Sequence, residues 1–273
     1  MSAELAPDAH GAYPQWRARW LAANPQWRLL EVFWPAARRP PAAIFELLIE
    51  QWFEAAVGIE EPAVARLKLA WWGEELAELA SGRPRHPLTV ELAKESGVAQ
   101  LLLPLAAARR SFAQLIDSDA IGSTPQLLGT LEAAAAAMLD AGRIAGLWAP
   151  PLPAPTALAA AWWIGQLRAW PSISRTQRGL LPLSVLARAG VGRAAAIDLA
   201  DPAARRVLVE LATELAAHAL AEPRGSMIAA RIAAAQWSAQ QIVRKPQRVL
   251  EGAATARPWA LLWRLWRASS AAG

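Results

Sequence analysis

The most constraining feature of this sequence is a helical periodicity that extends over nearly the whole chain. Alanine and leucine dominate, runs of β-branched residues are missing, and no segment alternates apolar and polar residues as a half-buried strand would. Glycine and proline fall at the breaks between periodic segments, where helices begin and end. The chain is therefore predicted to be all-α, with helices over residues 41–57, 64–80, 87–96, 101–117, 124–146, 157–170, 183–189, 202–221, 225–243 and 258–268.

Length and composition limit the class of protein. A chain of 273 residues that is 55% hydrophobic can bury a large core in one domain, and no run approaches the roughly 18 apolar residues of a spanning helix. Cysteine is absent, which excludes disulfides, zinc–thiolate sites and cysteine catalysis. The first residues lack a basic region followed by an apolar core, so no secretory signal is expected and a cytoplasmic location is predicted.

The net charge of +5 is carried mainly by arginine, since the only lysines are Lys68, Lys94 and Lys245. Arginine favours planar, bidentate contacts with phosphate and carboxylate groups. The arginines are scattered among alanine and leucine and form no dense basic run, so a nucleic-acid partner is not expected. A diphosphate or an anionic lipid surface fits this charge pattern.

Two separated blocks of residues resemble members of the squalene/phytoene synthase family. The first is RLKLAWWGEEL over Arg66–Leu76, followed by GRPRHPL over Gly82–Leu88; the second is RGLLPL over Arg178–Leu183, followed by ARAGV over Ala187–Val191. Their order and spacing resemble those of the family. The resemblance implies a single-domain isoprenoid-synthase-type helical bundle with a central apolar cavity over residues 25–256, preceded by an N-terminal arm (1–24) and followed by a Trp/Arg-rich tail (257–273).

The resemblance also implies a chemistry for such a fold. Family enzymes join two prenyl diphosphates head to head, and two DxxxD motifs facing each other across the cavity bind the magnesium ions that hold the diphosphates. Carboxylates one helical turn apart project from the same face, and their hard oxygens suit magnesium. The metal and nearby arginines absorb the charge that develops as diphosphate leaves.

This chain departs from that pattern in both motifs. No two of its six aspartates are four residues apart, so it contains no DxxxD motif. At the first motif position stand Glu50 and Glu54, which could still bind magnesium or could, with Glu46, form a solvated helix face. At the second position the aspartates are replaced by Ala169 and Ile173, neither of which can bind a metal.

Three arginines near the second motif remain candidates for binding an anionic ligand. Arg168 matches the family arginine that precedes the first aspartate, and Arg175 and Arg178 follow it. Together they could hold a diphosphate or a lipid headgroup, or they could belong to a surface loop in which arginine maintains solubility.

The 15 tryptophans suggest two roles. Trp52 and Trp163 are predicted on helices, where they could pack in the core or line a cavity for a polyprenyl chain. In the tail, Trp259, Leu262, Trp263 and Trp266 share one helical face, flanked by Arg264 and Arg267. That face suits a membrane interface or docking onto the bundle itself.

These observations favour a squalene/phytoene synthase-like protein without head-to-head prenyl transferase activity. It would act as a prenyl-lipid-binding, scaffold or assembly protein, with no catalytic residues and no cofactor, and with an unidentified protein partner. Attachment to the inner face of a membrane is an open alternative to a purely cytoplasmic location. Two alternatives for function stay open, which are an active magnesium-dependent farnesyl or geranylgeranyl diphosphate transferase in isoprenoid biosynthesis and a plain helical interaction module.

Overall fold

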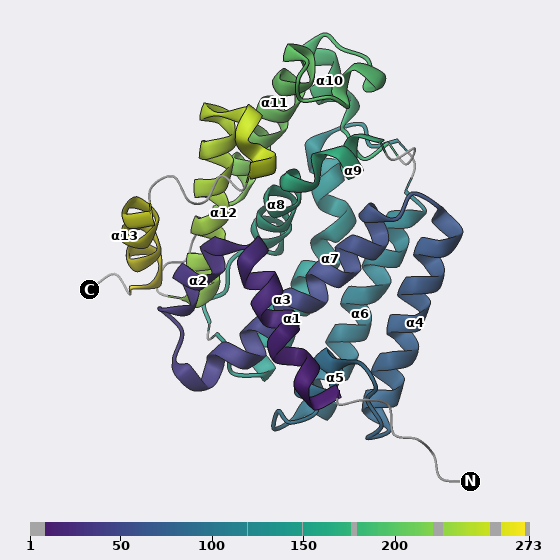
Figure 1. Ribbon diagram of the computed structural model, residues 1–273, viewed down its shortest axis with the longest axis vertical. Coiled ribbons are helices and arrows are strands. Elements are labelled where there is room, and N and C mark those ends of the chain that lie inside the picture. The colour runs from purple at the N-terminus through teal and green to yellow at the C-terminus, as the bar shows by residue number, and fades with distance from the viewer. Residues whose placement is uncertain are drawn as a thin grey trace.

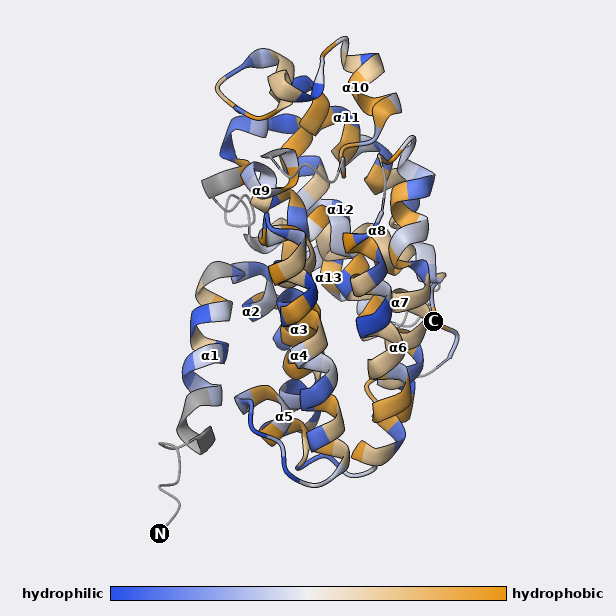
Figure 2. Cartoon of the chain, turned by 90° about the vertical axis from the view of Figure 1, so that its right-hand side faces the viewer, coloured by the Kyte–Doolittle hydropathy of each residue, from blue (hydrophilic) through white to orange (hydrophobic). Residues whose placement is uncertain are grey.

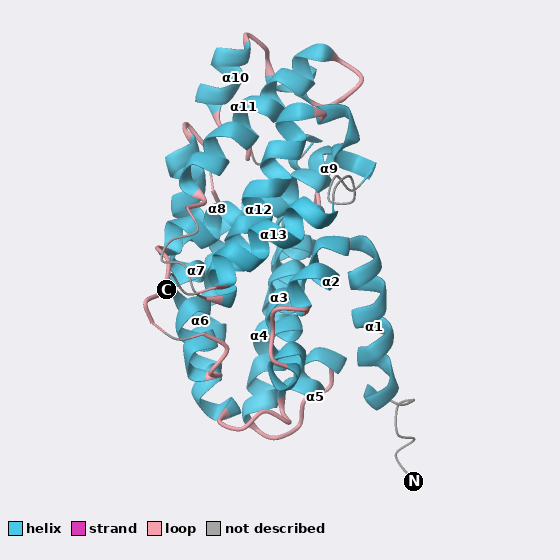
Figure 3. Cartoon of the chain, turned by 90° about the vertical axis from the view of Figure 1, so that its left-hand side faces the viewer, coloured by secondary structure: helices cyan, strands magenta, loops and turns pink. Residues whose placement is uncertain are grey.

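The computed structural model describes residues 9–118, 120–148, 150–175, 179–220, 226–251 and 258–270. Every regular element within these ranges is a helix (Figure 3), which confirms the all-α prediction. The α-helices are α1 (Ala9–Ala23), α2 (Pro25–Glu31), α3 (Arg39–Phe53), α4 (Pro62–Ala80), α5 (Pro87–Leu92), α6 (Val98–Ile116), α7 (Thr124–Ile144), α8 (Pro155–Gln166), α9 (Trp170–Arg175), α10 (Leu183–Ala189), α11 (Pro202–His218), α12 (Met227–Arg244) and α13 (Pro258–Ser269).

Many of these helices begin with a recognisable start signal. Proline occupies the first turn of α4, α7 and α11, where the missing N–H leaves no hydrogen bond unmade. A side chain just before the helix then accepts a backbone N–H: Asp201 Oδ1 accepts from Ala203 N at 2.7 Å, and Ser226 Oγ accepts from Ala229 N at 3.1 Å. The proline-rich breaks in the sequence are therefore the starts of helices.

Two predicted helices are interrupted in the structure. The segment predicted as 41–57 becomes α3 followed by a π-helical turn, η2 (Glu54–Gly58). The segment predicted as 157–170 becomes α8, a 3₁₀ turn, η3 (Leu167–Ala169), and the short helix α9. Both interruptions change which side chains share a helix face, because π and 3₁₀ turns advance by a different angle per residue than an α-helix.

The helices pack around one continuous apolar core. Helix α6 packs on α4 and α7, α8 contacts α7, α11 and α12, and α13 lies at the periphery against α12 and α2 (Figure 1). Hydrophobic and hydrophilic residues are interspersed along the helices (Figure 2), and the buried residues join into a single cluster from Tyr13 to Ala268. The segment 1–24, expected as an arm, carries α1, whose Trp20 and Leu21 belong to this core.

A buried carboxylate organises the turn between α4 and α5. Glu75 on α4 is fully buried and accepts hydrogen bonds from the backbone N–H groups of Arg85 (2.7 Å) and His86 (2.8 Å) and from the hydroxyl of Thr89. Burial raises the pKa of Glu75, but these hydrogen bonds outweigh it and the net pKa is lowered. The block Arg66–Leu88 that carries the family resemblance is therefore held together by a structural acid.

His86 in the same turn has a structural role as well. Its Nδ1 accepts the backbone N–H of Leu88 at 3.1 Å and so caps α5, while its ring contacts Trp72 at 4.7 Å between centroids. Burial lowers its pKa to about 4, with Lys68 adding to the shift and Glu75 opposing it. The neutral ring is the form that fits this turn.

We expect His86 to make stability fall as the solution is acidified. The unfolded chain takes up its proton near the ordinary histidine pKa of 6.5 and the folded chain only near 4, so stability present at neutral pH is lost between these values. Allowing for partial exposure, the loss of unfolding free energy is about 2 kcal/mol. His86→Asn keeps a capping side chain but removes the titrating ring. In urea unfolding, its free energy of unfolding should change less with pH than that of the wild type above about pH 5. His218→Asn, an exposed control, should retain the wild-type slope, and equal slopes for all three proteins would contradict the prediction.

Candidate functional site

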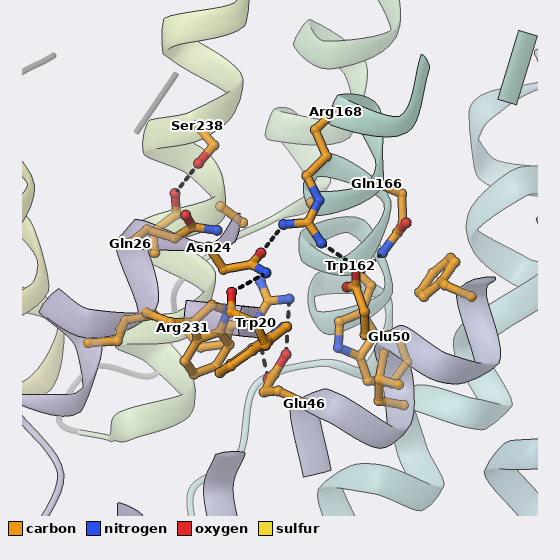
Figure 4. A pocket seen from close by; sticks show the side chains of 17 residues that line it. Trp20, Asn24, Gln26, Glu46, Glu50, Trp162, Gln166, Arg168, Arg231 and Ser238 are labelled. Atoms are coloured by element: carbon orange, nitrogen blue, oxygen red, sulfur yellow. Dashed lines mark hydrogen bonds and ion pairs between the residues drawn. The ribbon is translucent and has the colours of Figure 1, made fainter. Parts of the chain in front are cut away.

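Charged and aromatic side chains from four parts of the chain converge on one small pocket (Figure 4). Its walls come from α1 and α2, α3, the end of α8 with η3, and α12. The cavity volume is about 40 Å³, which holds about three water molecules. The lining residues are Trp20, Asn24, Gln26, Trp27, Leu30, Glu46, Ile49, Glu50, Phe53, Trp162, Gly165, Gln166, Arg168, Arg231, Ala234, Ala235 and Ser238.

The deepest charges in this pocket are Glu46 on α3 and Arg231 on α12. Arg231 Nε donates to Glu46 Oε1 at 3.2 Å and Nη2 donates to Oε2 at 3.5 Å, while Nη1 reaches the carbonyl oxygen of Ala161 at 3.3 Å. Their side chains are only 12% and 17% exposed, for Arg231 and Glu46 respectively. Burial raises the pKa of Glu46, and Arg231 partly opposes that shift. The pair is therefore a forked, nearly buried ion pair that fixes α3 to α12.

A second ion pair lies one turn further along α3. Arg168 in η3 donates through Nη2 to Glu50 Oε1 and through Nη1 to the side-chain oxygen of Asn24. Gln166 Nε2 donates to the other Glu50 oxygen at 3.4 Å. Asn24 in turn donates to the carbonyl oxygen of Trp20 at 3.0 Å. Arg168 thus connects α3 to the α1–α2 corner, and Glu50 has a partner on each carboxylate oxygen.

Glu54, predicted to bind a metal together with Glu50, does not line the pocket. Its side chain is 56% exposed and accepts from Lys68 Nζ and Gln51 Nε2, both at 3.1 Å. Glu54 ends α3, where its N–H still bonds to the carbonyl oxygen of Glu50, and its side chain pairs with Lys68 and Gln51 outside the pocket. Among the described residues, no group of three or more histidine or acidic side chains is arranged to hold a metal ion.

Of the three candidate anion-binding arginines, the structure describes the side chain of Arg168 alone. Arg168 lines the pocket and is already paired with Glu50. Arg175 ends α9, but its side chain lies outside the described residues, as does all of Arg178. At the second motif position, Ala169 lies in η3 and Ile173 is buried, so neither supplies a polar atom to the pocket.

Trp52 and Trp163, proposed as ligand-binding residues, lie in the closed aromatic core beside the pocket. Trp52 contacts Phe112 at 5.9 Å and Trp163 contacts Phe53 at 5.4 Å between ring centroids. Both tryptophans are essentially inaccessible to solvent, and neither lines the pocket. The structure thus gives them the packing role that was one of their two predicted roles.

Sequence reasoning missed several pocket residues, among them Asn24, Gln166 and Arg231. A usable signal existed for Arg231, because it is a lone charged residue within the first sixteen residues of an alanine-rich helix whose neighbours are apolar. For Asn24 and Gln166 the sequence holds no comparable signal, since polar amides at helix ends are common. Their role depends on helices that are distant in sequence.

A wider hollow of about 320 Å³ lies on the surface between α10, α11 and η5 (Pro246–Glu251). It is lined by Arg188, Arg205 and Arg206 together with proline, alanine and valine, and Glu210 pairs with Arg188 at 3.7 Å. None of the candidate residues from the sequence lies there, whereas Glu50 and Arg168 both line the smaller pocket, which is therefore the candidate site. Comparisons of the chain with protein-family models, curated proteins and solved structures found no match.

Removing Arg231 should strongly destabilise the protein. Arg231→Met would leave the Glu46 carboxylate buried without its partner, which costs about 3 kcal/mol of unfolding free energy. Lowering the pH should shrink this deficit, because the unpaired Glu46 carboxyl then binds a proton and becomes neutral. Denaturant unfolding measures both effects. Arg244→Met, at the exposed end of the same helix, should change stability by less than about 0.5 kcal/mol, and an equal loss in both variants would contradict the assignment.

Proposed function

We propose that this chain is a squalene/phytoene synthase-like protein that has lost head-to-head prenyl transfer and acts as a scaffold or assembly protein attached peripherally to a membrane. The observation that carries the proposal is the pairing of Glu50 with Arg168 at the first motif position, where the resemblance implies metal-binding carboxylates, while Glu54, the other acid of that motif, pairs with Lys68. Both acids of the first motif are therefore already paired with cationic side chains of the protein itself.

The relative positions of the two motif segments support kinship with the family. The resemblance implies that the two acidic helices face each other across a cavity mouth. Glu50, at the first motif position, and Arg168, beside the second, are 118 residues apart in sequence and form an ion pair across the pocket.

The chemistry of the pocket supports the loss of catalysis. Magnesium binds several oxygen ligands in octahedral geometry and usually bridges carboxylates to substrate phosphates. Here Ala169 and Ile173 contribute no oxygen, and each oxygen of Glu50 already accepts a hydrogen bond. Binding magnesium would require breaking the Arg168 pair and leaving that guanidinium half-buried without its carboxylate, which is costly.

The size of the pocket favours a scaffold over a prenyl-lipid carrier. A farnesyl chain has fifteen carbons, far more than a cavity for about three water molecules can enclose. The neighbouring aromatic residues Trp52, Phe53 and Phe112 are packed against one another with ring centroids 4.9 to 5.9 Å apart. A prenyl chain would have to displace this core, so the proposed activity lies on the surface of the protein.

A turnover assay tests the loss of catalysis. With farnesyl or geranylgeranyl diphosphate and magnesium, we expect no release of diphosphate above the enzyme-free background. Arg168→Ala, which frees Glu50, should not restore release, because the second motif still lacks ligands. Magnesium-dependent release that Glu50→Gln abolishes would overturn the proposal in favour of an active transferase. Tight diphosphate binding without turnover, lost in Arg168→Ala, would instead establish the lipid-binding form.

The peripheral location is proposed from the tail of the chain. Within the described residues, no helix combines the length and the hydrophobicity that crossing a bilayer requires. Helix α13 nevertheless leaves Trp259, Trp263 and Trp266 exposed at the periphery of the bundle. A scaffold held at a membrane surface could use such a helix for attachment.

A further inference from the structure

Helix α13 has two apolar faces, of which the bundle covers only one. Leu261, Leu265 and Ala268 are buried against the rest of the protein. The opposite face carries Trp259, Trp263 and Trp266, which are 82%, 55% and 56% exposed. The sequence pattern alone suggested that this tryptophan face could dock onto the bundle, and the structure docks the other face. Three exposed tryptophans in one stripe form an apolar patch of the kind that marks an interaction site.

Polar contacts hold α13 in this orientation. Arg264 Nη1 donates to Gln240 Oε1 of α12 at 2.7 Å, and its guanidinium lies 5.0 Å from the ring of Trp237. Because Arg264 faces the bundle, the tryptophan stripe is directed outward. Arg267 lies 4.8 Å from the ring of Trp263 and so places a cation beside the exposed tryptophans. The outward stripe is thus a fixed surface of the folded protein.

The charge of this region selects an anionic partner. Helix α13 contains no acidic residue, and of its two arginines Arg264 faces the bundle while Arg267 lies beside the exposed tryptophans. Arginine beside tryptophan is the composition of helices that lie in the plane of a membrane interface, where the indole rings reach the headgroup level. At 12 residues, about 18 Å, the helix is too short to cross a hydrocarbon core of about 30 Å.

We propose that α13 binds the surface of an anionic bilayer, lying in its plane with Trp259, Trp263 and Trp266 inserted among the headgroups and Arg267 near the lipid phosphates. The inference rests on the peripheral location proposed above and is independent of the pocket. Tryptophan and arginine are also enriched in protein interfaces; a bilayer is favoured here because Arg267 lies beside the rings and the helix carries no acid that anionic headgroups would repel.

Vesicle flotation with the full chain tests this inference. The protein should bind vesicles of phosphatidylcholine with about one third phosphatidylglycerol about tenfold more tightly than pure phosphatidylcholine, and salt should weaken the binding. Replacing Trp259, Trp263 and Trp266 by serine should weaken binding at least about 100-fold. Arg267→Gln should reduce the preference for anionic lipid about fivefold.

A matched control distinguishes binding by this surface from non-specific hydrophobic binding to vesicles. Leu67 on α4 and Leu103 on α6 are 70% and 75% exposed on helices that lie across the bundle from α13 (Figure 1). The Leu67→Ser/Leu103→Ser variant should bind vesicles as the wild type does, and circular dichroism should show all variants folded. The proposal is overturned if the wild-type protein does not bind anionic vesicles. It is also overturned if the triple tryptophan variant binds them with wild-type affinity. Self-association that depends on the three tryptophans would instead assign the face to a second copy. Neither outcome bears on the diphosphate assay, which reports on the pocket alone.

Discussion

The neutralisation of two α3 carboxylates by arginines from distant helices is the interaction on which the centre of this molecule depends. Glu46 and Glu50 point from one face of α3 into the pocket, where their side chains are only 17% and 33% exposed, and a carboxylate withdrawn from water without a partner is unfavourable. Arg231 from α12 pairs with Glu46, and Arg168 from η3 pairs with Glu50. These contacts offset the cost of removing the carboxylates from water, and they also set the positions of α12 and the end of α8 relative to α3. Each guanidinium donates to two different partners and so acts as a structural joint between segments of the chain. Unlike a metal ion, it offers no coordination position to a substrate.

The joint extends to the N-terminal helices through Asn24. This side chain is buried between α1 and α2, accepts from Arg168 and donates to the carbonyl oxygen of Trp20, which places the α1–α2 corner directly over the pocket. Trp20 and Trp27 pack against each other at 5.1 Å, and the guanidinium of Arg231 lies 5.6 Å from the Trp27 ring. Polar and aromatic contacts therefore close the same corner, and the small volume of the pocket follows from how completely these side chains fill it.

The helical class and most helix positions could be predicted from the sequence because they depend on local signals. Proline in the first turn and an aspartate or serine cap mark the beginnings of α7 and α11 within a residue or two, and the stripe through Leu69, Trp72 and Leu76 identifies the buried face of α4. The break at η3 carries no such signal, and this 3₁₀ turn carries Arg168 into the pocket. Arg231 could have been noticed as a lone charge on an alanine-rich helix, but its partner could not, and Asn24 gave no signal, because both contacts form only when helices distant in sequence come together.

The tryptophans divide into two populations with different physical roles. In the core, burial of the large ring outweighs an incompletely satisfied indole N–H: in the described part of the chain, Nε1 of Trp52, Trp72 and Trp163 has no hydrogen-bond partner, an omission that costs about 1–3 kcal/mol each. Those positions are therefore held by packing alone, and they supply no directed polar group to a ligand. The tryptophans of α13 differ in that more than half of the accessible surface of each one stays exposed. An interface between lipid headgroups and hydrocarbon buries such a ring while its N–H meets a polar acceptor.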